Sequence, residues 1–226
     1  MSGKGKLKVI AVDGPAGSGK TTVCSEVARR LGFLFISSGS IYRAYAWALL
    51  NTPHGLDLQD FVRELKSLPL EFDVLEGSFI VRYQGRVING ELHDPRVAME
   101  ASRLAKIQEV REFANEVQKT LAAKAPVVVE GRDATTVVFP DACLKVFLTA
   151  TPEERASRRW RELVAKGVSV AFDDILKEVV KRDMADSERS LAPLLQAPDA
   201  VMIDTTGVDV ETVVERIVEL YRQKCS

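Results

Sequence analysis

A short glycine-rich segment near the start of the chain constrains the fold more than any other feature. It has the sequence GPAGSGKTT over residues 14–22 and directly follows the apolar run VIAV at 9–12. The pattern G-x-x-x-x-G-K-[ST] is matched at every fixed position, ending in Lys20 and Thr21. A strand, a glycine turn and a helix in this order form a phosphate-binding loop, in which backbone N–H groups and a helix N-terminus surround an anion. The segment predicts an α/β fold that binds a nucleoside triphosphate.

Two side chains of this loop have expected tasks. Lys20 would reach the β- and γ-phosphates, and the Thr21 hydroxyl would ligate Mg²⁺. Because GTPases, ATPases and small-molecule kinases all use such a loop, it does not say where the γ-phosphoryl group goes. The sequence DTTG at 204–207 matches the D-x-x-G of GTPases, but it lies close to the chain end, and the chain has no N-K-x-D motif. We interpret DTTG as a strand end and a turn before the last helix.

Short apolar runs alternate with long amphipathic stretches, which is typical of βα units and a parallel sheet. We expect strands at residues 8–12, 34–37, 127–130, 145–148 and 200–203, and helices at 20–31, 41–50, 58–66, 95–123, 152–165, 172–189 and 210–223. Residues 70–92 differ, because their β-rich runs are separated by Glu-Gly, Gln-Gly and Asn-Gly, which predicts a small antiparallel meander. The sequence thus predicts one domain over residues 1–226, an α/β core with an inserted subdomain at about 40–112.

Composition limits the partners of the chain. Of its 226 residues, 46% are hydrophobic and 28% charged, so it can bury a core. The net charge of −1 gives no overall attraction to nucleic acid or to an anionic membrane, and no apolar run is long enough to span a membrane. The cysteines Cys24, Cys143 and Cys225 form no CxxC motif and no metal-binding spacing. We expect reduced thiols, a cytoplasmic location and, with no long apolar seam, a monomer.

Polar residues gather where two of the predicted strands end. Ser38 and Arg43 follow the second strand in SSGSIYR, and Glu130, Arg132 and Asp133 end the third in VVVEGRD. Ligands of open α/β sheets bind at the carboxyl ends of the strands. Arginine suits phosphate because its planar fork donates to two oxygens and stays charged when buried. These residues predict a second anion site beside the first.

Two predicted helices carry further arginines on one face. The first has Arg155, Arg158 and Arg159 at i, i+3 and i+4, and the second has Arg182, Asp186 and Arg189 at i, i+4 and i+7. The alternative is that they form ordinary ion pairs on solvated helix faces, since several have an acidic residue four positions away. Spacing alone does not decide between the two interpretations.

Histidine is rare in this chain. His54 and His93 are the only two, and both lie in polar, loop-like contexts, so no Ser/His/Asp or Cys/His arrangement can be assembled. Transfer of a phosphoryl group to another phosphate needs none, because the acceptor oxygen is already anionic and positioning with charge neutralisation carries the rate. An arginine-rich, histidine-poor chain suits a phosphate acceptor better than an alcohol acceptor.

The chain resembles the bacterial-type cytidylate (CMP) kinases from Val9 to Arg222. The resemblance rests on the segments DGPAGSGKTT, SSGSIYR, VINGELHDPRVAMEAS, VREFANEVQ, VVEGRDATTVVFPDACLKVFLTATPEERASRR, RDMADSERSLAPL and DAVMIDTTG. The long segment beginning at VVEGRD is the most specific of these. The D-G-[FY]-P-R element of adenylate kinases is missing. The resemblance implies a P-loop kinase fold: a five-stranded parallel sheet flanked by helices, an inserted antiparallel β/helical subdomain that binds the nucleoside monophosphate, and a short helical lid at about 154–172.

The resemblance also implies a role for each matched residue. ATP would be held by Gly14, Pro15, Ala16, Gly17, Ser18, Gly19, Lys20, Thr21 and Thr22, with Arg158 and Arg159 reaching it from the lid, to which Arg155 also belongs. CMP would be held at its phosphate and ribose by Ser38, Arg43 and Arg132, at its cytosine edge by Ser102, Arg111 and Asp133, and at its sugar by Arg182 and Asp186. The catalytic set would be Lys20, Arg132, Arg158 and Arg189, of which Arg189 reaches the phosphates at the transfer site.

Two segments depart from the pattern of that family. Ser37 stands where the family more often has an acidic residue or threonine, and Gly39-Ser40 stands where it has Gly-Ala. In GRDATT, Ala134-Thr135 lacks the glycine of the commoner G-R-D-[IM]-G-T, so the loop after Asp133 is expected to be stiffer.

The resulting prediction is transfer of a phosphoryl group from ATP, with Mg²⁺, to CMP or dCMP. Glu130 is our candidate for the carboxylate that anchors Mg²⁺-bound water, and Asp13 is its rival. Two alternatives stay open: a P-loop kinase of another small acceptor such as UMP or shikimate, and an NTPase switch that transfers nothing.

Overall fold

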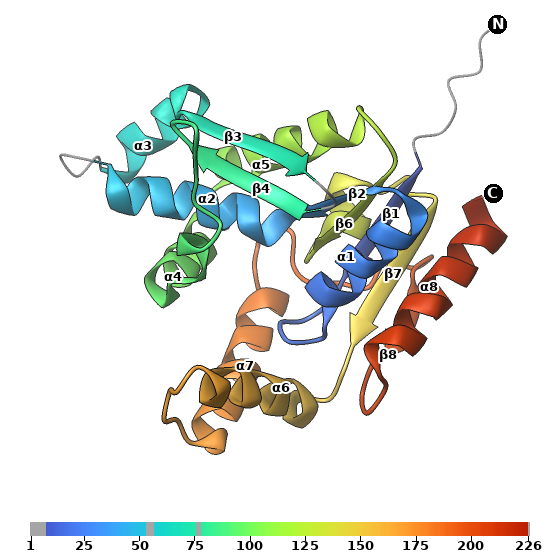
Figure 1. The fold of residues 1–226 in the computed structure, drawn as a ribbon. Coiled ribbons are helices and arrows are strands. Elements are labelled where there is room, and N and C mark those ends of the chain that lie inside the picture. The colour runs from blue at the N-terminus through green and yellow to red at the C-terminus, as the bar shows by residue number, and fades with distance from the viewer. Residues whose placement is uncertain (1–7, 53–56, 76–77, 226) are drawn as a thin grey trace, which may run out of the picture.

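The computed structural model describes residues 8–52, 57–75 and 78–225, so His54 lies outside the described residues. Its centre is a five-stranded parallel sheet in the order β2-β6-β1-β7-β8, formed by Val9–Asp13 (β1), Leu34–Ser37 (β2), Val127–Gly131 (β6), Leu144–Thr149 (β7) and Val201–Asp204 (β8) (Figure 1). Strands β1 and β6 are buried at every residue, as expected for a parallel sheet covered on both faces. The predicted parallel sheet is confirmed.

Helices cover this sheet. They are Lys20–Leu31 (α1), Ser38–Asn51 (α2), Leu58–Glu64 (α3), Pro95–Leu104 (α4), Gln108–Ala122 (α5), Pro152–Ala165 (α6), Phe172–Ser187 (α7) and Val210–Cys225 (α8), with shorter turns at Leu65–Ser67 (η1), Glu91–His93 (η2) and Ala134–Val138 (η3). Helix α1 packs against α8 beside the sheet, and α6 packs against α7 below it (Figure 1). Local signals set the ends of these helices: Thr151 caps α6 ahead of Pro152, and Gly32 ends α1 with a φ of 65°.

A second, antiparallel sheet, which contacts β2 of the first, confirms the predicted meander. It joins Leu70–Leu75 (β3), Ser78–Tyr83 (β4) and Arg86–Val87 (β5) in the order β3-β4-β5. It lies over α2 in Figure 1, where Trp47 of α2 meets Tyr83 edge to face at 5.2 Å between ring centroids. The limits of the insert, 40 and 112, and those of the lid, 154 and 172, stay predictions.

The predicted helix over residues 95–123 is wrong, because the chain breaks it into α4 and α5. Ile107 is extended, with φ −98° and ψ 124°, and only then does α5 begin. The Arg111 guanidinium donates to the carbonyl of Ala105 at 3.1 Å and so satisfies an acceptor that the break releases. This side-chain contact from α5 takes the place of a helical hydrogen bond. The spacing of apolar residues in the sequence does not reveal such a contact. Similarly, α7 ends at Ser187, so Arg189 lies beyond the helix in which we predicted it.

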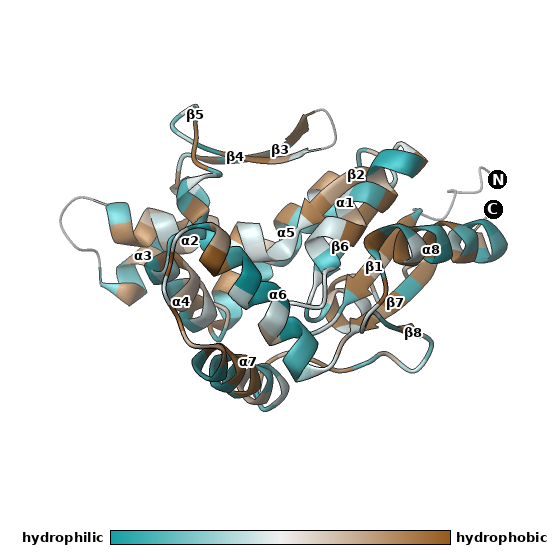
Figure 2. Cartoon of the chain, turned by 60° about the horizontal axis from the view of Figure 1, so that its bottom comes forward, coloured by the Kyte–Doolittle hydropathy of each residue, from teal (hydrophilic) through white to brown (hydrophobic). Residues whose placement is uncertain are grey.

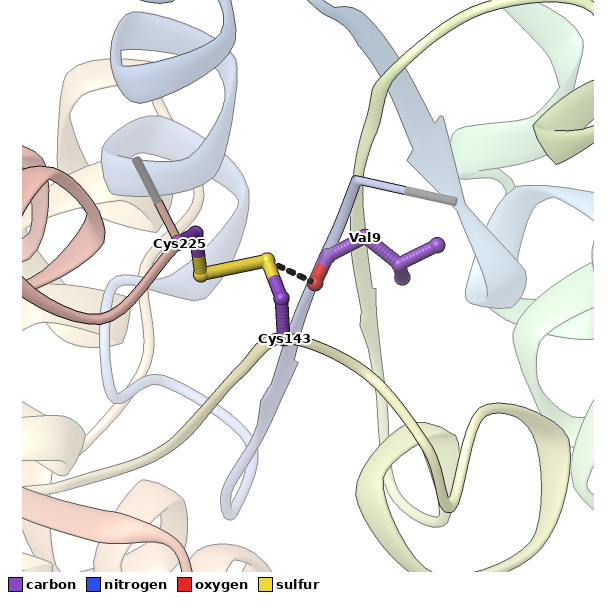
Figure 3. Close-up of a disulfide and its surroundings, with 3 residues drawn as sticks. All are labelled: Val9, Cys143 and Cys225. Carbon is purple, nitrogen blue, oxygen red and sulfur yellow. Dashed lines mark hydrogen bonds between the residues drawn. A yellow bond between two sulfur atoms is a disulfide. The ribbon is translucent and has the colours of Figure 1, made fainter. Parts of the chain in front are cut away.

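The expectation of three reduced cysteines is wrong for two of them. Cys143 at the start of β7 and Cys225 at the end of α8 form a disulfide with a Cα–Cα distance of 5.7 Å, while Cys24 is free and buried (Figure 3). The two lie 82 residues apart in sequence, and α8 returns to β7 only in the folded chain. Without a local motif, the sequence could not pair them.

The hydropathy of the elements matches their position in the fold, with apolar strands at the centre and more polar helices around them. In Figure 2, strands β1 and β7 are brown and α6 is largely teal. One core joins the central sheet to α1, α2, α5 and α8, and a separate small cluster of Ala156, Ile175 and Val179 holds α6 to α7. The helix pair below the sheet therefore has an apolar contact of its own. Within the described ranges, no helix combines the length and the apolar character that crossing a membrane requires.

Candidate active site

The phosphate-binding loop connects β1 to α1 in a conformation that only glycine adopts easily. Gly14, Gly17 and Gly19 have φ values of 152°, 78° and 86°. A Cβ at Gly14 would lie 1.9 Å from the carbonyl oxygen of Leu148, so the loop packs directly on β7. Gly19 precedes α1, and no side chain caps that helix. The first amides of α1 are left for an anion.

Lys20 is folded back over this loop. Its Nζ donates to the carbonyl of Pro15 at 2.7 Å, and the residue is only 4% exposed. Burial, and after it the nearby charge of Arg132, lowers the pKa of Lys20 to about 7. An anion in the loop would reverse this shift because it favours the charged amine.

A chain of hydroxyls links Thr21 to the end of β6. Glu130 Oε1 accepts from the Thr21 hydroxyl at 3.2 Å and from the Ser37 hydroxyl at 2.7 Å, and Ser40 donates to Ser37 at 3.1 Å. Parallel pairing of β2 with β6 sets Ser37 beside Glu130. These hydroxyl and carboxylate oxygens are the hard donors that Mg²⁺ prefers, so the residues present fit this metal.

Asp13, the rival carboxylate, is occupied elsewhere. Its Oδ1 accepts from the amide of Ala134 at 2.9 Å, and its Oδ2 accepts from the amide and hydroxyl of Thr135 at 2.7 and 2.6 Å. Burial raises the pKa of Asp13, although these three donors oppose the shift. Both oxygens of Asp13 thus accept hydrogen bonds, whereas the two bonds to Glu130 both end on Oε1.

The two residues after β6 form ion pairs with two different elements. Arg132 Nε donates to Asp186 Oδ2 of α7 at 2.8 Å. Asp133 pairs with Arg111 of α5, and both side chains are buried. Burial raises the pKa of Asp133, and the Arg111 and Arg189 charges oppose the shift. The structure thus brings Arg111 and Asp133 together as the resemblance implied.

Several more cations lie near Arg132. Burial comes first in lowering the pKa of both Arg43 and Arg182, and the charge of Arg132 lowers each further. The pKa of Asp186 lies below its ordinary value, because the nearby arginines outweigh its burial. Arg189 Nη2 is buried with no hydrogen-bond partner in the described part of the chain, and its nearest carboxylate oxygen, Asp186 Oδ1, is 4.0 Å away. Such a group of mutually repelling cations is what a bound anion stabilises.

Of the arginines predicted to share one face of α6, Arg155 and Arg158 donate to other segments of the chain. Arg155 is 3% exposed and donates to the carbonyls of Ala150 and Ala16 and to both oxygens of Asp183 on α7, at 2.5 to 3.1 Å. Arg158 pairs with Glu154 at 2.9 Å and donates to the Thr205 hydroxyl at 3.1 Å. Arg159 is exposed and pairs with Glu162 at 3.3 Å. Of the two interpretations left open, the ion pair on a solvated helix face describes Arg159, whereas Arg155 is buried.

Ser102 is not brought into this site by a hydrogen bond. It is exposed on α4, and its hydroxyl donates to the carbonyl of Ala98 within its own helix at 3.2 Å. Ser38 is buried at the start of α2, and a Cβ on Gly131 would lie 2.9 Å from its hydroxyl oxygen. The predicted site residues of α2, β6 and α7 therefore meet in one region, with Ser102 outside their contacts.

Sequence reasoning missed three residues that hold this site together. They are Ser37, Asp183 and Thr205; the Thr205 hydroxyl donates to the carbonyl of Thr149 and accepts from Arg158. Ser37 and Thr205 could have been noticed as hydroxyls at the ends of predicted strands, where ligands gather. Asp183 had no such signal, since it is one of several acidic residues on α7.

Comparison with known proteins agrees with this geometry. The family model described as cytidylate kinase matches residues 10–223. The chain belongs to the cytidylate kinase family. A cytidylate kinase of Thermosipho melanesiensis is 44% identical over 216 residues, covering 96% of this chain and 97% of the relative. Another, from Clostridioides difficile, is 41% identical over 210 residues, covering 93% and 96%.

A solved structure supports the fold alone. An uncharacterized protein from Eubacterium ventriosum superposes with a TM-score of 0.54 at 18% sequence identity, covering 96% of this chain and 99% of that one. Membership of the cytidylate kinase family makes the chain a transferase, and the P-loop and the arginine group are the parts of it that such an activity would use.

Proposed function

We propose that this protein transfers the γ-phosphoryl group of ATP to CMP and dCMP, which yields ADP with CDP or dCDP. The observation that carries the proposal is the cation group beside the phosphate-binding loop. Arg132 acts electrostatically on Lys20 of the loop and on Arg43 and Arg182 of the second region, so one continuous cationic region faces both phosphates. Transfer between two phosphates is limited by charge repulsion, which such a region relieves.

ATP binds in the P-loop in this proposal. Residues 14–22 surround the β- and γ-phosphates through their amides, and Lys20 adds a positive charge at the γ-phosphoryl group. Arg158 and Arg159 approach ATP from α6, and closure of residues 154–172 over the site excludes the water that would otherwise hydrolyse ATP. Arg158 already contacts the turn after β8 through Thr205, which supports its place beside the loop.

Mg²⁺ is held by the Thr21 hydroxyl and, through water, by Glu130. The 3.2 Å hydrogen bond between these two groups supports this choice, and the three donors on Asp13 oppose its rival. When bound, the metal neutralises charge on the β- and γ-phosphates.

CMP lies on the other side of Arg132. Its phosphate binds Ser38, Arg43 and Arg132, its sugar binds Arg182 and Asp186, and its cytosine edge binds Arg111, Asp133 and Ser102. Ser102 is exposed, and its hydroxyl donates within α4 to the carbonyl of Ala98. Arg189 supplies its unpaired Nη2 to the oxygens of the transferring group.

The protein works as a cytoplasmic monomer in pyrimidine nucleotide metabolism and needs neither nucleic acid nor membrane.

The test is ADP release from ATP and Mg²⁺ with CMP, dCMP, UMP, AMP, GMP or shikimate, each supplied alone. Strong turnover with CMP and dCMP only is the expected result. Turnover mainly with UMP or shikimate would move the protein to another acceptor, and release that ignores every acceptor would make it an NTPase. The Lys20→Ala variant is the control, and it should lose turnover with every acceptor.

A second measurement tests the base-reading pair. Arg111→Ala should raise the KM for CMP at least about tenfold and reduce the preference for CMP over UMP, because it leaves Asp133 buried without its partner. Arg103→Ala, an exposed neighbour on α4 paired with Glu100, is the matched control and should change neither value. An unchanged preference in the Arg111 variant would remove the assignment.

A further inference from the structure

The buried carboxylate of Asp13 holds the backbone that carries Arg132 and Asp133. Asp13 ends β1 directly before Gly14 and is fully buried between β6 and β7, opposite Gly131 and Phe147. Its three hydrogen bonds all go to Ala134 and Thr135, which lie more than 120 positions further along the chain. One side chain thus connects the start of the P-loop to the segment just after the second anion region.

This connection resembles a helix cap supplied from another part of the chain. The turn η3 begins at Ala134, and Asp133 is its capping position, but the Asp133 side chain makes no capping hydrogen bond. An Asp in this position usually accepts from the second or third amide of the turn. Here Asp13 accepts from the first two amides, those of Ala134 and Thr135, and Asp133 is left to pair with Arg111.

We infer that Asp13 is a positioning residue, which caps the 134–138 turn in place of Asp133 and so directs Asp133 and Arg132 toward the acceptor nucleotide. Thr135 completes the arrangement, because its hydroxyl gives the carboxylate a third donor at 2.6 Å. The carboxylate lies beside Gly131, where a Cβ would be in ordinary contact with Asp13 Oδ1 at 3.5 Å but would crowd the Ser38 hydroxyl at 2.9 Å. The inference rests on the proposed binding of CMP by Arg132 and Asp133.

The alternative is that Asp13 only satisfies buried amides. A purely structural role would change the stability of the fold, or KM for both substrates together. A positioning role changes KM for the acceptor and leaves KM for ATP in place, because the P-loop glycines and Lys20 make their own contacts. The two roles can therefore be distinguished by whether KM for CMP rises while KM for ATP stays the same.

The experiment compares Asp13→Asn, Thr135→Val and Thr135→Ser in the full chain. Asp13→Asn keeps the shape but replaces one acceptor oxygen with a donor, so KM for CMP should rise about tenfold or more while KM for ATP stays within about twofold. Thr135→Val should raise KM for CMP about threefold, and Thr135→Ser, which restores the hydroxyl, should return it to the parent value. Equal increases in both KM values, or no rescue by serine, would overturn the inference.

Amide hydrogen exchange gives a readout that does not depend on the substrate. In the parent protein the amides of Ala134 and Thr135 should be protected, and Thr135→Val should speed their exchange while distant strands such as β8 keep theirs. Unchanged exchange at both amides in the variants would overturn the positioning role. If Asp13→Asn fails to fold, the two Thr135 variants carry the comparison.

Asp133→Asn separates this inference from the proposed function. If that variant leaves KM for CMP unchanged, the assignment of the acceptor pocket is wrong, regardless of the result of amide hydrogen exchange. If it raises KM for CMP and Asp13→Asn does not, the pocket stands and the role of Asp13 is wrong.

Discussion

The arginines of α6 and those of α7 lie on two helices packed against each other, yet they meet different partners. The Arg155 guanidinium on α6 donates hydrogen bonds to the carbonyl of Ala16 in the P-loop and to the carboxylate of Asp183. Arg189, just after α7, keeps a buried guanidinium nitrogen that lacks a hydrogen-bond partner among the described residues. The first arrangement is satisfied without a ligand, whereas the second leaves a buried donor open to an acceptor such as a phosphate oxygen.

We propose that this difference separates an arginine with a structural role, Arg155, from one that binds substrate, Arg189. A buried cation with every donor paired stabilises the connection between elements, in this case the P-loop and the α6–α7 pair. A buried cation with an open donor keeps capacity for substrate. The three predictions below test this distinction, in order of decreasing effect.

Arg189→Ala should cause the largest loss. Removing a donor aimed at charge in the transition state costs about 3 kcal/mol, so kcat should fall about 100-fold or more. The melting temperature should change little, because within the described residues the change removes one hydrogen bond, the 3.3 Å contact with the carbonyl of Asp186, and a long ion pair of 4.0 Å with its carboxylate. Steady-state kinetics and thermal melting measure the two effects.

Arg216→Ala on α8 is the matched control, since Arg216 is half exposed and pairs with Glu219 at 3.0 Å. It should leave kcat unchanged. If Arg189→Ala also keeps kcat within about threefold of the parent, the open nitrogen is not a catalytic donor.

Arg155→Met should mainly lower stability. It leaves Asp183 without its partner and the carbonyl of Ala16 without a donor, and we expect a loss of about 2 kcal/mol in the free energy of unfolding. The loss stays below that of a fully buried pair because the Asp183 side chain is 26% exposed. Urea unfolding measures it.

A double-mutant cycle with Asp183→Ala sharpens this prediction. The two changes should be less than additive, because either one already breaks the pair. Strictly additive losses would show that Arg155 acts through the carbonyls alone. A kcat loss as large as that of Arg189→Ala would contradict the structural role.

Arg159→Ala should have the smallest effect. Its exposed pair with Glu162 contributes at most about 0.5 kcal/mol to stability. If Arg159 reaches ATP when the lid closes, KM for ATP should still rise about threefold. A KM for ATP that does not change on this substitution would remove Arg159 from the ATP site.

Sequence patterns predicted the strands well, and the misses have a common cause. The helix over 95–123 was drawn through Ala105–Ile107 because nothing local marks a break, and the Arg111 guanidinium that supports it belongs to the next helix. The pairing of Cys143 with Cys225 was missed because α8 meets β7 only in the folded chain. Both features depend on contacts between residues that local patterns treat separately.

The candidate site likewise contains features that local sequence patterns predict and features that only the packing of distant elements reveals. The P-loop was predictable because its glycines, lysine and threonine are consecutive and their conformation is fixed by local sterics. The arginine spacing predicted a shared face on α6, but it did not reveal that α7 ends before Arg189, and it gave no information on what each face meets. Only the packing of α6 against the P-loop paired Arg155 with Ala16.

By itself, the sequence determined the α/β class, the phosphate-binding loop and the membership of the cytidylate kinase family, because consecutive residues and periodic patterns carry these features. The tertiary structure gave the two candidate carboxylates different hydrogen-bond donors. Asp13 and Glu130 both end buried strands, and the parallel register sets Val12 of β1 opposite Glu130. Glu130 faces the hydroxyls of Thr21 and Ser37, whereas Asp13 faces the amides of a turn more than 120 residues away. The donors around a buried carboxylate come from the elements that surround it, and only the fold brings those elements together.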